Sequence, residues 1–278
     1  MSKSLYLTPL LLILSISYSF SQQSFEPIEL AKKIFSKTEL KDLSSYCFGE
    51  YKGKPNGKDI SESASLHFLL LEQTNMKAVV TMTILDSSGK GLDTYLHFTK
   101  DKIWKLEAFR ALAMTGILEK VKEDMGKMTE SQIDSLIAYR PSQEKDFILF
   151  KDREDFNFKL GNINLTLALD SEIIAHFIKN SFDFNRIKDS IIASQKLNSD
   201  KVEISKETQA LMKKLYVDYE GSHYANFDNC ITFLIGGMLD NVVGYLYCTN
   251  KDKLPKMDPS RLIMLREIGG GWYIFKTT

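Results

Sequence analysis

Two stretches of the chain carry the same order of apolar runs, and this repetition constrains the fold more than any other feature. The first stretch has apolar runs at 66–71, 78–84, 94–98 and 103–106. The second has them at 230–235, 242–247, 262–265 and 272–275. β-Branched and aromatic residues bounded by turn residues are typical of antiparallel strands. We therefore predict two similar antiparallel sheets, each a meander, that arose by duplication rather than by chance similarity.

Helical periodicity appears between and before these runs. Apolar residues spaced by three and four predict helices over 26–35, 111–126, 129–139, 170–192 and 206–216. Asp170 is the predicted N-cap of the longest helix, with Glu172 in its first turn. Residues 147–150, 157–160 and 164–167 are predicted to be short strands.

These elements predict an α+β fold of two similar domains, each with helices packed on a curved antiparallel sheet. The first domain spans 22–125 and the second 170–278, with a connecting helix and short strands over 126–169. Residues 1–21 are a separate segment, predicted to be a signal peptide.

The N-terminal segment has the pattern of an export signal. Lys3 precedes an apolar run over 10–16, and Ser19-Phe20-Ser21 offers a small-residue cleavage site. A membrane-spanning helix needs about 20 apolar residues, so this run is too short to be one. We expect cleavage after Ser21 and a periplasmic or extracellular protein. The alternative is a buried N-terminal helix.

Charge and hydropathy argue against two classes of partner. The chain has 36 Lys and Arg and 36 Asp and Glu residues. Nucleic-acid binding proteins usually carry a basic excess that displaces counterions from phosphates, so we expect no nucleic-acid partner. We also expect no integral membrane segment after signal cleavage, since the sequence has no second long apolar run.

Three cysteines leave at least one unpaired. Cys230 and Cys248 lie symmetrically about residue 239, so a hairpin there places them opposite each other. A disulfide between them is possible in an exported protein, but directly opposed strand positions strain the bond. The alternative is two buried thiols. Their spacing fits no zinc pattern, and we expect no metal site and no cofactor.

The order of helix first and antiparallel sheet second resembles the NTF2-like or cystatin-like α+β superfamily. Residues 95–109 and 262–276 carry the resemblance, above all Trp104-Lys105-Leu106 and Trp272-Tyr273-Ile274. The resemblance covers about half of each repeat and implies a cavity between helix and sheet. That superfamily includes both enzymes and binding proteins, so it does not decide function. The helix over 170–192 also resembles a segment of exported bacterial proteins of unknown function.

Few residues are candidates for catalysis. In a cavity of that kind, His97 would be the base and Tyr95 the hydrogen-bond donor, both on one predicted strand. His67 on a strand and His176 beside an apolar helix face are predicted to be structural. Asp218, Tyr219 and His223 form a polar cluster that either binds a ligand or makes a turn.

The function that we expect from the sequence is binding of a protein or a small molecule, without catalysis. The alternative is a small-molecule enzyme, such as an isomerase, hydratase or hydrolase, that uses His97 and Tyr95. A third hypothesis is a structural partner in an envelope complex, joined through sheet edges.

Overall fold

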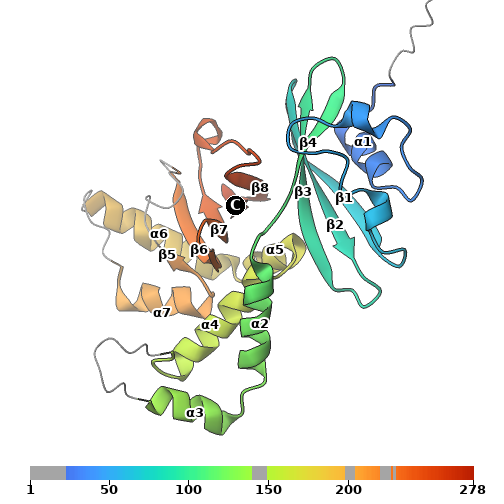
Figure 1. Ribbon diagram of the computed structural model, residues 1–278. Helices are drawn as coiled ribbons and strands as arrows, with labels where there is room; N and C mark the ends of the chain where they lie inside the picture. The colour runs from blue at the N-terminus through green and yellow to red at the C-terminus, as the bar shows by residue number, and fades with distance from the viewer. Residues whose placement is uncertain (1–22, 140–148, 198–203, 220–226, 228–229) are drawn as a thin grey trace, which may run out of the picture.

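The computed structural model describes residues 23–139, 149–197, 204–219, 227 and 230–278. In those ranges, two antiparallel sheets and seven α-helices make up the fold, which confirms the predicted α+β class (Figure 1). Short 3-10 helices, Leu43–Tyr46, Gly57–Asp59 and Lys251–Lys253, lie in the connections. No helix in the described ranges has the length and hydropathy to cross a membrane. The predicted signal peptide over 1–21 lies outside the described residues.

The first sheet is an antiparallel meander in chain order, as predicted. Its strands are β1 (Ser65–Gln73), β2 (Lys77–Leu85), β3 (Gly91–Lys100) and β4 (Trp104–Ala111). The turn between β2 and β3 explains why they pair. Asp86 Oδ1 accepts the backbone N–H groups of Ser88 and Lys90, at 2.8 and 3.0 Å. Gly89 there adopts a φ of 82°, which favours glycine.

Both faces of the first sheet are covered at its centre. Alternate residues of a strand point to opposite faces. Val80 and Leu96 pack on one side with Leu30 of α1 (Pro27–Ile34). Val79 and Tyr95 belong to the other side, where they join the core of the C-terminal half. Burial on both faces explains why β2 is an almost unbroken apolar run rather than an alternating one.

The second sheet differs from the first in strand order. Its strands are β5 (Asp218–Tyr219), β6 (Ile231–Met238), β7 (Asn241–Tyr247), β8 (Leu262–Gly269) and β9 (Trp272–Thr277). The order across the sheet is β5-β6-β7-β9-β8, so β9 lies between β7 and β8. The predicted second meander is therefore wrong. The loop between β7 and β8 carries the chain to the far edge before β9 returns to the interior.

The two tryptophans follow the last turn of each sheet, but their strands occupy different positions. Trp104 lies on the edge strand β4 and is buried in the core beneath α1. Trp272 lies on the interior strand β9, where its ring contacts Phe177, Phe184 and Phe233. Each is almost fully buried beneath the helices of its own half. The strand order thus does not support an exact duplication.

Helices α2 (Thr115–Gly126), α3 (Glu130–Ala138) and α4 (Arg153–Thr166) connect the two sheets (Figure 1). The short strands predicted over 157–160 and 164–167 are wrong, because both ranges lie in or at the end of α4. Asp152 caps this helix by accepting the Asp155 N–H. Of the first predicted strand, residues 147 and 148 lie outside the described residues, and Leu149 and Phe150 are not in a strand.

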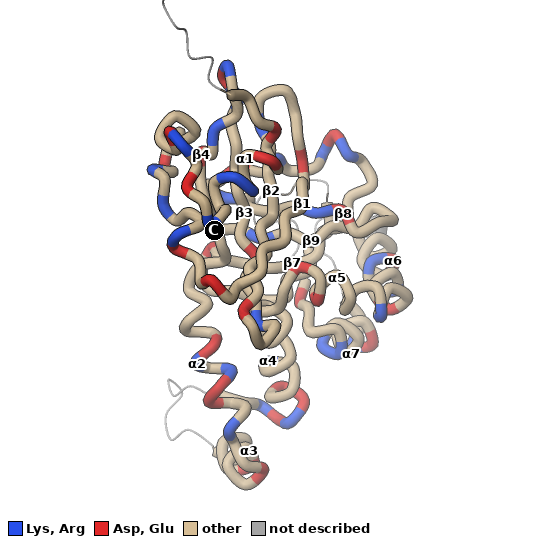
Figure 2. The backbone as a smooth tube through the Cα atoms, turned by 90° about the vertical axis from the view of Figure 1, so that its right-hand side faces the viewer, with Lys and Arg blue, Asp and Glu red and all other residues tan. Residues whose placement is uncertain are grey.

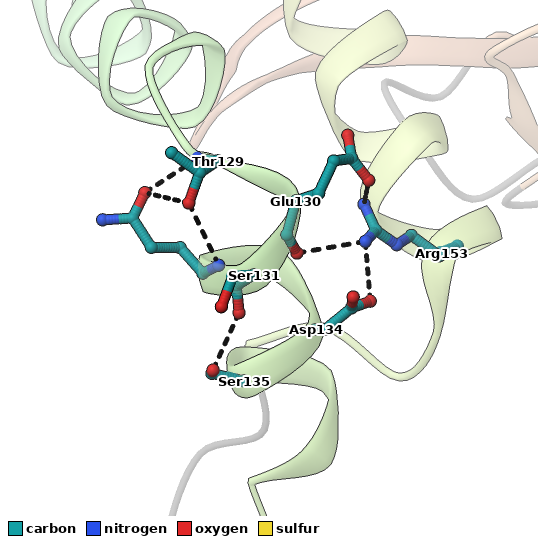
Figure 3. A network of polar contacts seen from close by, with 7 residues as sticks. Thr129, Glu130, Ser131, Asp134, Ser135 and Arg153 are labelled. Atoms are coloured by element: carbon teal, nitrogen blue, oxygen red, sulfur yellow. Dashed lines mark hydrogen bonds and ion pairs between the residues drawn. The ribbon is translucent and has the colours of Figure 1, made fainter.

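Polar contacts fix α3 against the start of α4 (Figure 3). Thr129 and Gln132 form the capping box of α3, as the predicted helix start at Thr129 requires. Arg153, the first residue of α4, forms ion pairs with Glu130 and Asp134 of α3 at 2.7 and 2.6 Å. Both pairs are largely exposed, so they orient the two helices more than they stabilise them.

The helix predicted over 170–192 is two helices, α5 (Asp170–Lys179) and α6 (Ser181–Leu197), separated at Asn180. Together with α7 (Lys206–Lys214) they cover the second sheet. Asp170 is the first residue of α5 rather than its N-cap, which is Leu169. That prediction is wrong because the cap acceptor comes from elsewhere in the chain, as described below.

Candidate functional site

Tyr95 and His97 lie on β3 with both side chains directed at the C-terminal half. Tyr95 is fully buried and His97 is 4% exposed. His97 Nε2 lies 3.1 Å from the carbonyl oxygen of Ile263 on β8. Burial lowers the pKa of His97 to about 4, so the imidazole is neutral at pH 7. Neither side chain lines the clefts described below, and catalysis by this pair stays an alternative prediction.

The Tyr95 hydroxyl belongs to a polar group, buried except for the half-buried Thr83, that we call the junction cluster: Thr83, Asp93, Tyr95, Asp170 and Lys276. Tyr95 donates a hydrogen bond to Asp170 Oδ1 at 2.8 Å. The Lys276 ammonium lies 2.9 Å from the same oxygen. The Thr83 hydroxyl donates to Asp93. The cluster therefore joins the first sheet to α5 and to β9.

Asp93 supplies the cap that α5 lacks. Leu169, at the N-cap position, has no side-chain acceptor, and Asp93 Oδ2 accepts the Asp170 N–H at 2.6 Å instead. Glu172 adds a second local bond by accepting the Leu169 N–H. Burial and the nearby Asp170 carboxylate raise the pKa of Asp93. A residue of the first sheet thus caps a helix that packs on the second sheet.

A small cavity of about 30 Å³ adjoins the junction cluster. Asp93 and Lys276 contribute to its walls together with Leu112, Thr115 and Thr166. That volume holds one or two water molecules, since a single water needs about 10–15 Å³. The junction cluster is therefore too closed for an organic substrate.

A larger pocket of about 370 Å³ lies between α2 and α4. Its lining is mainly apolar and comprises Val121, Asp124, Met125, Met128, Leu149, Phe150, Lys159, Asn162 and Ile163. Small-molecule sites have volumes of roughly 300–1,000 Å³ and mostly apolar walls. We call it the α2–α4 pocket. The sequence prediction missed it because this part of α4 was assigned to two short strands and the turn between them.

The polar groups of the α2–α4 pocket already have protein partners. Lys159 Nζ donates to the Leu149 carbonyl at 2.7 Å and to Asp155 at 3.0 Å. Asp124 accepts from Lys120 at 2.7 Å. Because Lys159 and Asp124 are both paired with other protein groups, neither charge is available to bind a charged ligand.

His176 lines a separate open cleft of about 500 Å³ together with Lys122, Glu172 and Tyr216. Its Nδ1 lies 3.2 Å from the Tyr245 hydroxyl, which itself donates to the Ile173 carbonyl. Nδ1 must therefore carry a proton and donate it. Burial, aided by Lys179, lowers the pKa of His176. These contacts match the predicted structural role.

The remaining candidates lie apart from these sites. His67 is exposed on β1, Asp218 is exposed on β5, and Tyr219 packs against Phe233. His223 lies outside the described residues. The predicted cluster of Asp218, Tyr219 and His223 therefore stays a prediction.

Cys230 and Cys248 face each other as the hairpin predicts. Ile231 pairs with Tyr247, and the cysteines occupy the next opposed position, where both are buried thiols without a disulfide. Burial and the adjacent Cys248 thiol raise the pKa of Cys230 to about 12. A thiol with that pKa is a poor nucleophile at neutral pH.

Charges of both signs are interspersed over the described chain (Figure 2). Within the described ranges, no group of three or more His, Cys, Asp or Glu side chains is placed to hold a metal ion. Comparison with models of known protein families, with curated proteins and with solved structures finds no match for the chain. The resemblance to NTF2-like or cystatin-like proteins therefore stays a prediction.

Proposed function

We propose that the protein is exported and binds a small, uncharged, apolar molecule in the α2–α4 pocket, without catalysing a reaction on it. The observation that carries the proposal is the pocket itself, with a volume of about 370 Å³ and apolar walls. Export is inferred from the N-terminal signal pattern. The proposed function fits the expectation from the sequence that the protein is a binding module.

Pocket size suggests the class of ligand. An apolar protein cavity of about 150 Å³ holds one benzene molecule. The α2–α4 pocket is more than twice that volume, which suits a molecule with two aromatic rings or a medium-length hydrocarbon chain. Burial of such a ligand contributes roughly 25 cal/mol for each Å² of apolar surface removed from water. Contacts with Met125, Met128 and Phe150 would supply most of this stabilisation.

Fluorescence titration with N-phenyl-1-naphthylamine, an uncharged aromatic probe, tests the proposal. Val121 lines the pocket and is 39% exposed, so V121W places a large ring across it. Ile117 lies one turn earlier on α2, is 49% exposed and is not in the lining. The matched control is therefore I117W.

We expect saturable binding by the wild type and I117W, and at least about tenfold weaker binding by V121W, a loss of about 1.4 kcal/mol. Equal affinity in all three proteins would exclude the α2–α4 pocket as the binding site. If the wild type binds neither this probe nor a medium-chain alkane in a saturable way, the proposed ligand class is rejected.

A further inference from the structure

Lys276 and Asp170 form an ion pair buried more deeply than any other among the described residues. Lys276 Nζ lies 2.9 Å from Asp170 Oδ1, and the two side chains are 5% and 2% exposed. The other carboxylate oxygen, Oδ2, is buried and receives no hydrogen bond from a described residue. Withdrawing both charged groups from water is costly, so the burial of this pair requires an explanation.

We propose that Lys276 and Asp170 react with each other in the folded protein to form an amide cross-link between Nζ and Cγ. The new N–C bond replaces the bond from Cγ to Oδ2, and Oδ2 leaves as water. The ammonium group gives up two of its three protons to that water, and the third stays on the amide nitrogen. Both charges disappear, and no oxidant, reductant or other reactant is needed.

The contact geometry suits this reaction. The nucleophile is held against the carboxyl group without any diffusion step, which removes much of the entropic barrier to a bimolecular reaction.

Tyr95 is placed to stabilise the intermediate. Its hydroxyl donates a hydrogen bond to Asp170 Oδ1 at 2.8 Å. This oxygen becomes negatively charged when the lysine nitrogen attacks Cγ, and it then remains as the carbonyl oxygen of the amide. A fixed donor aimed at such an oxygen in a water-excluded site lowers the barrier. Desolvation and the neighbouring carboxylates raise the pKa of Tyr95 well above its ordinary value, so the hydroxyl keeps its proton.

Asp93 provides a second carboxyl group next to the pair. It interacts electrostatically with both Asp170 and Lys276, and a carboxyl group in this position can take up a proton and release it again. Its hydrogen bond from the Asp170 N–H also fixes the start of α5. The adjoining cavity of about 30 Å³, with walls from Asp93 and Lys276, has room for the water that leaves.

Mass spectrometry of the intact, reduced and denatured protein tests the cross-link. We expect a mass lower by one water than the mass calculated from the measured N-terminus to Thr278. Proteolysis should release one branched peptide that contains both Asp170 and Lys276. A wild-type mass equal to the calculated value would overturn the proposal.

Variants separate this reaction from any other loss of water. K276M and D93N should show the full calculated mass, and Y95F should form the cross-link several-fold more slowly. The matched control is K251M, because Lys251 forms an ion pair of 2.8 Å with Glu267 on the surface. K251M should keep the water loss. Water loss that persists in K276M would contradict the assignment, and water loss at the wild-type rate in soluble, folded Y95F would contradict the role of Tyr95.

Discussion

The His97 imidazole and the Ile263 carbonyl are joined across the two halves of the protein, with Nε2 lying 3.1 Å from the oxygen. This contact ties an interior strand of the first sheet to the edge strand of the second. Val79 and Tyr95 pack in the same apolar core as Ile263. The halves therefore share one buried junction, and changes in the first sheet should affect the stability of the second.

The stability of the protein should fall as the pH is lowered from about 7 to 4. His97 binds a proton below pH 6.5 when unfolded but only near pH 4 when folded, because burial lowers its pKa. The unfolded state thus binds more protons in this window, and the free energy of unfolding decreases by up to about 3 kcal/mol. Urea denaturation at pH 7 and pH 4.5 measures the loss.

H97Q keeps a donor for the Ile263 carbonyl and should remove this part of the pH dependence. H67Q, at an exposed position on β1, should leave it unchanged. An unaltered pH dependence in H97Q would show that His97 is not buried and neutral in the native state.

Substitution F184A should lower the free energy of unfolding by about 3–5 kcal/mol. Phe184 is fully buried, with ring centroids of Phe177, Tyr245 and Trp272 within 5.9 Å. The matched control is F182A, two residues earlier on α6, where the side chain is 76% exposed. It should change stability by no more than about 0.5 kcal/mol. Equal effects in urea denaturation would mean that α6 packs on a different face.

Substitution G161A should destabilise the protein although alanine favours helices. A Cβ atom at residue 161 would lie 2.2 Å from the Tyr216 ring, so α4 or the ring must move. At Gly116 in α2 a Cβ meets nothing within 4 Å, and G116A should stabilise by up to about 1 kcal/mol. Thermal unfolding compares the two variants. Stabilisation by G161A would contradict the packing of α4.

Much of the first sheet was predictable because local information specifies it. Its strands follow one another in chain order, and Asp86 and Gly89 define a turn within a few residues. The position of β9 between β7 and β8 depends on contacts between distant segments, which apolar runs do not encode. Helix α4 was missed because Asn157, Gly161 and Asn162 weaken its helix propensity and its packing against Tyr216 overrides this.

The junction cluster was only partly predictable. Tyr95 was identified as a candidate because it shares a strand face with His97. Asp93 and Lys276 are single charged residues near strand ends, a position that usually indicates solvent exposure. Their burial follows from the packing of the two halves, which is a tertiary property. The lone lysine directly after the apolar run at 272–275 was the available signal.

Export should remove the first 21 residues. When the full chain is expressed in a bacterial host, the mature protein in the periplasm or medium should begin at Gln22, as N-terminal sequencing measures. L12R interrupts the apolar run and should keep the uncleaved chain in the cytoplasm, whereas K3R should be exported normally. Wild-type protein that stays in the cytoplasm and retains Met1 would contradict the predicted export signal.

Hydrogen exchange at the Asp170 amide tests the shared junction most directly. First-turn amides of a helix normally lack an acceptor, as at the exposed Lys206 of α7, and exchange fast. The Asp170 N–H instead donates to Asp93 of the other sheet at 2.6 Å in a buried site. We expect the Asp170 amide to be protected as strongly as the interior amides of β9. Exchange as fast as that of Lys206 would show that the two halves do not share a closed core.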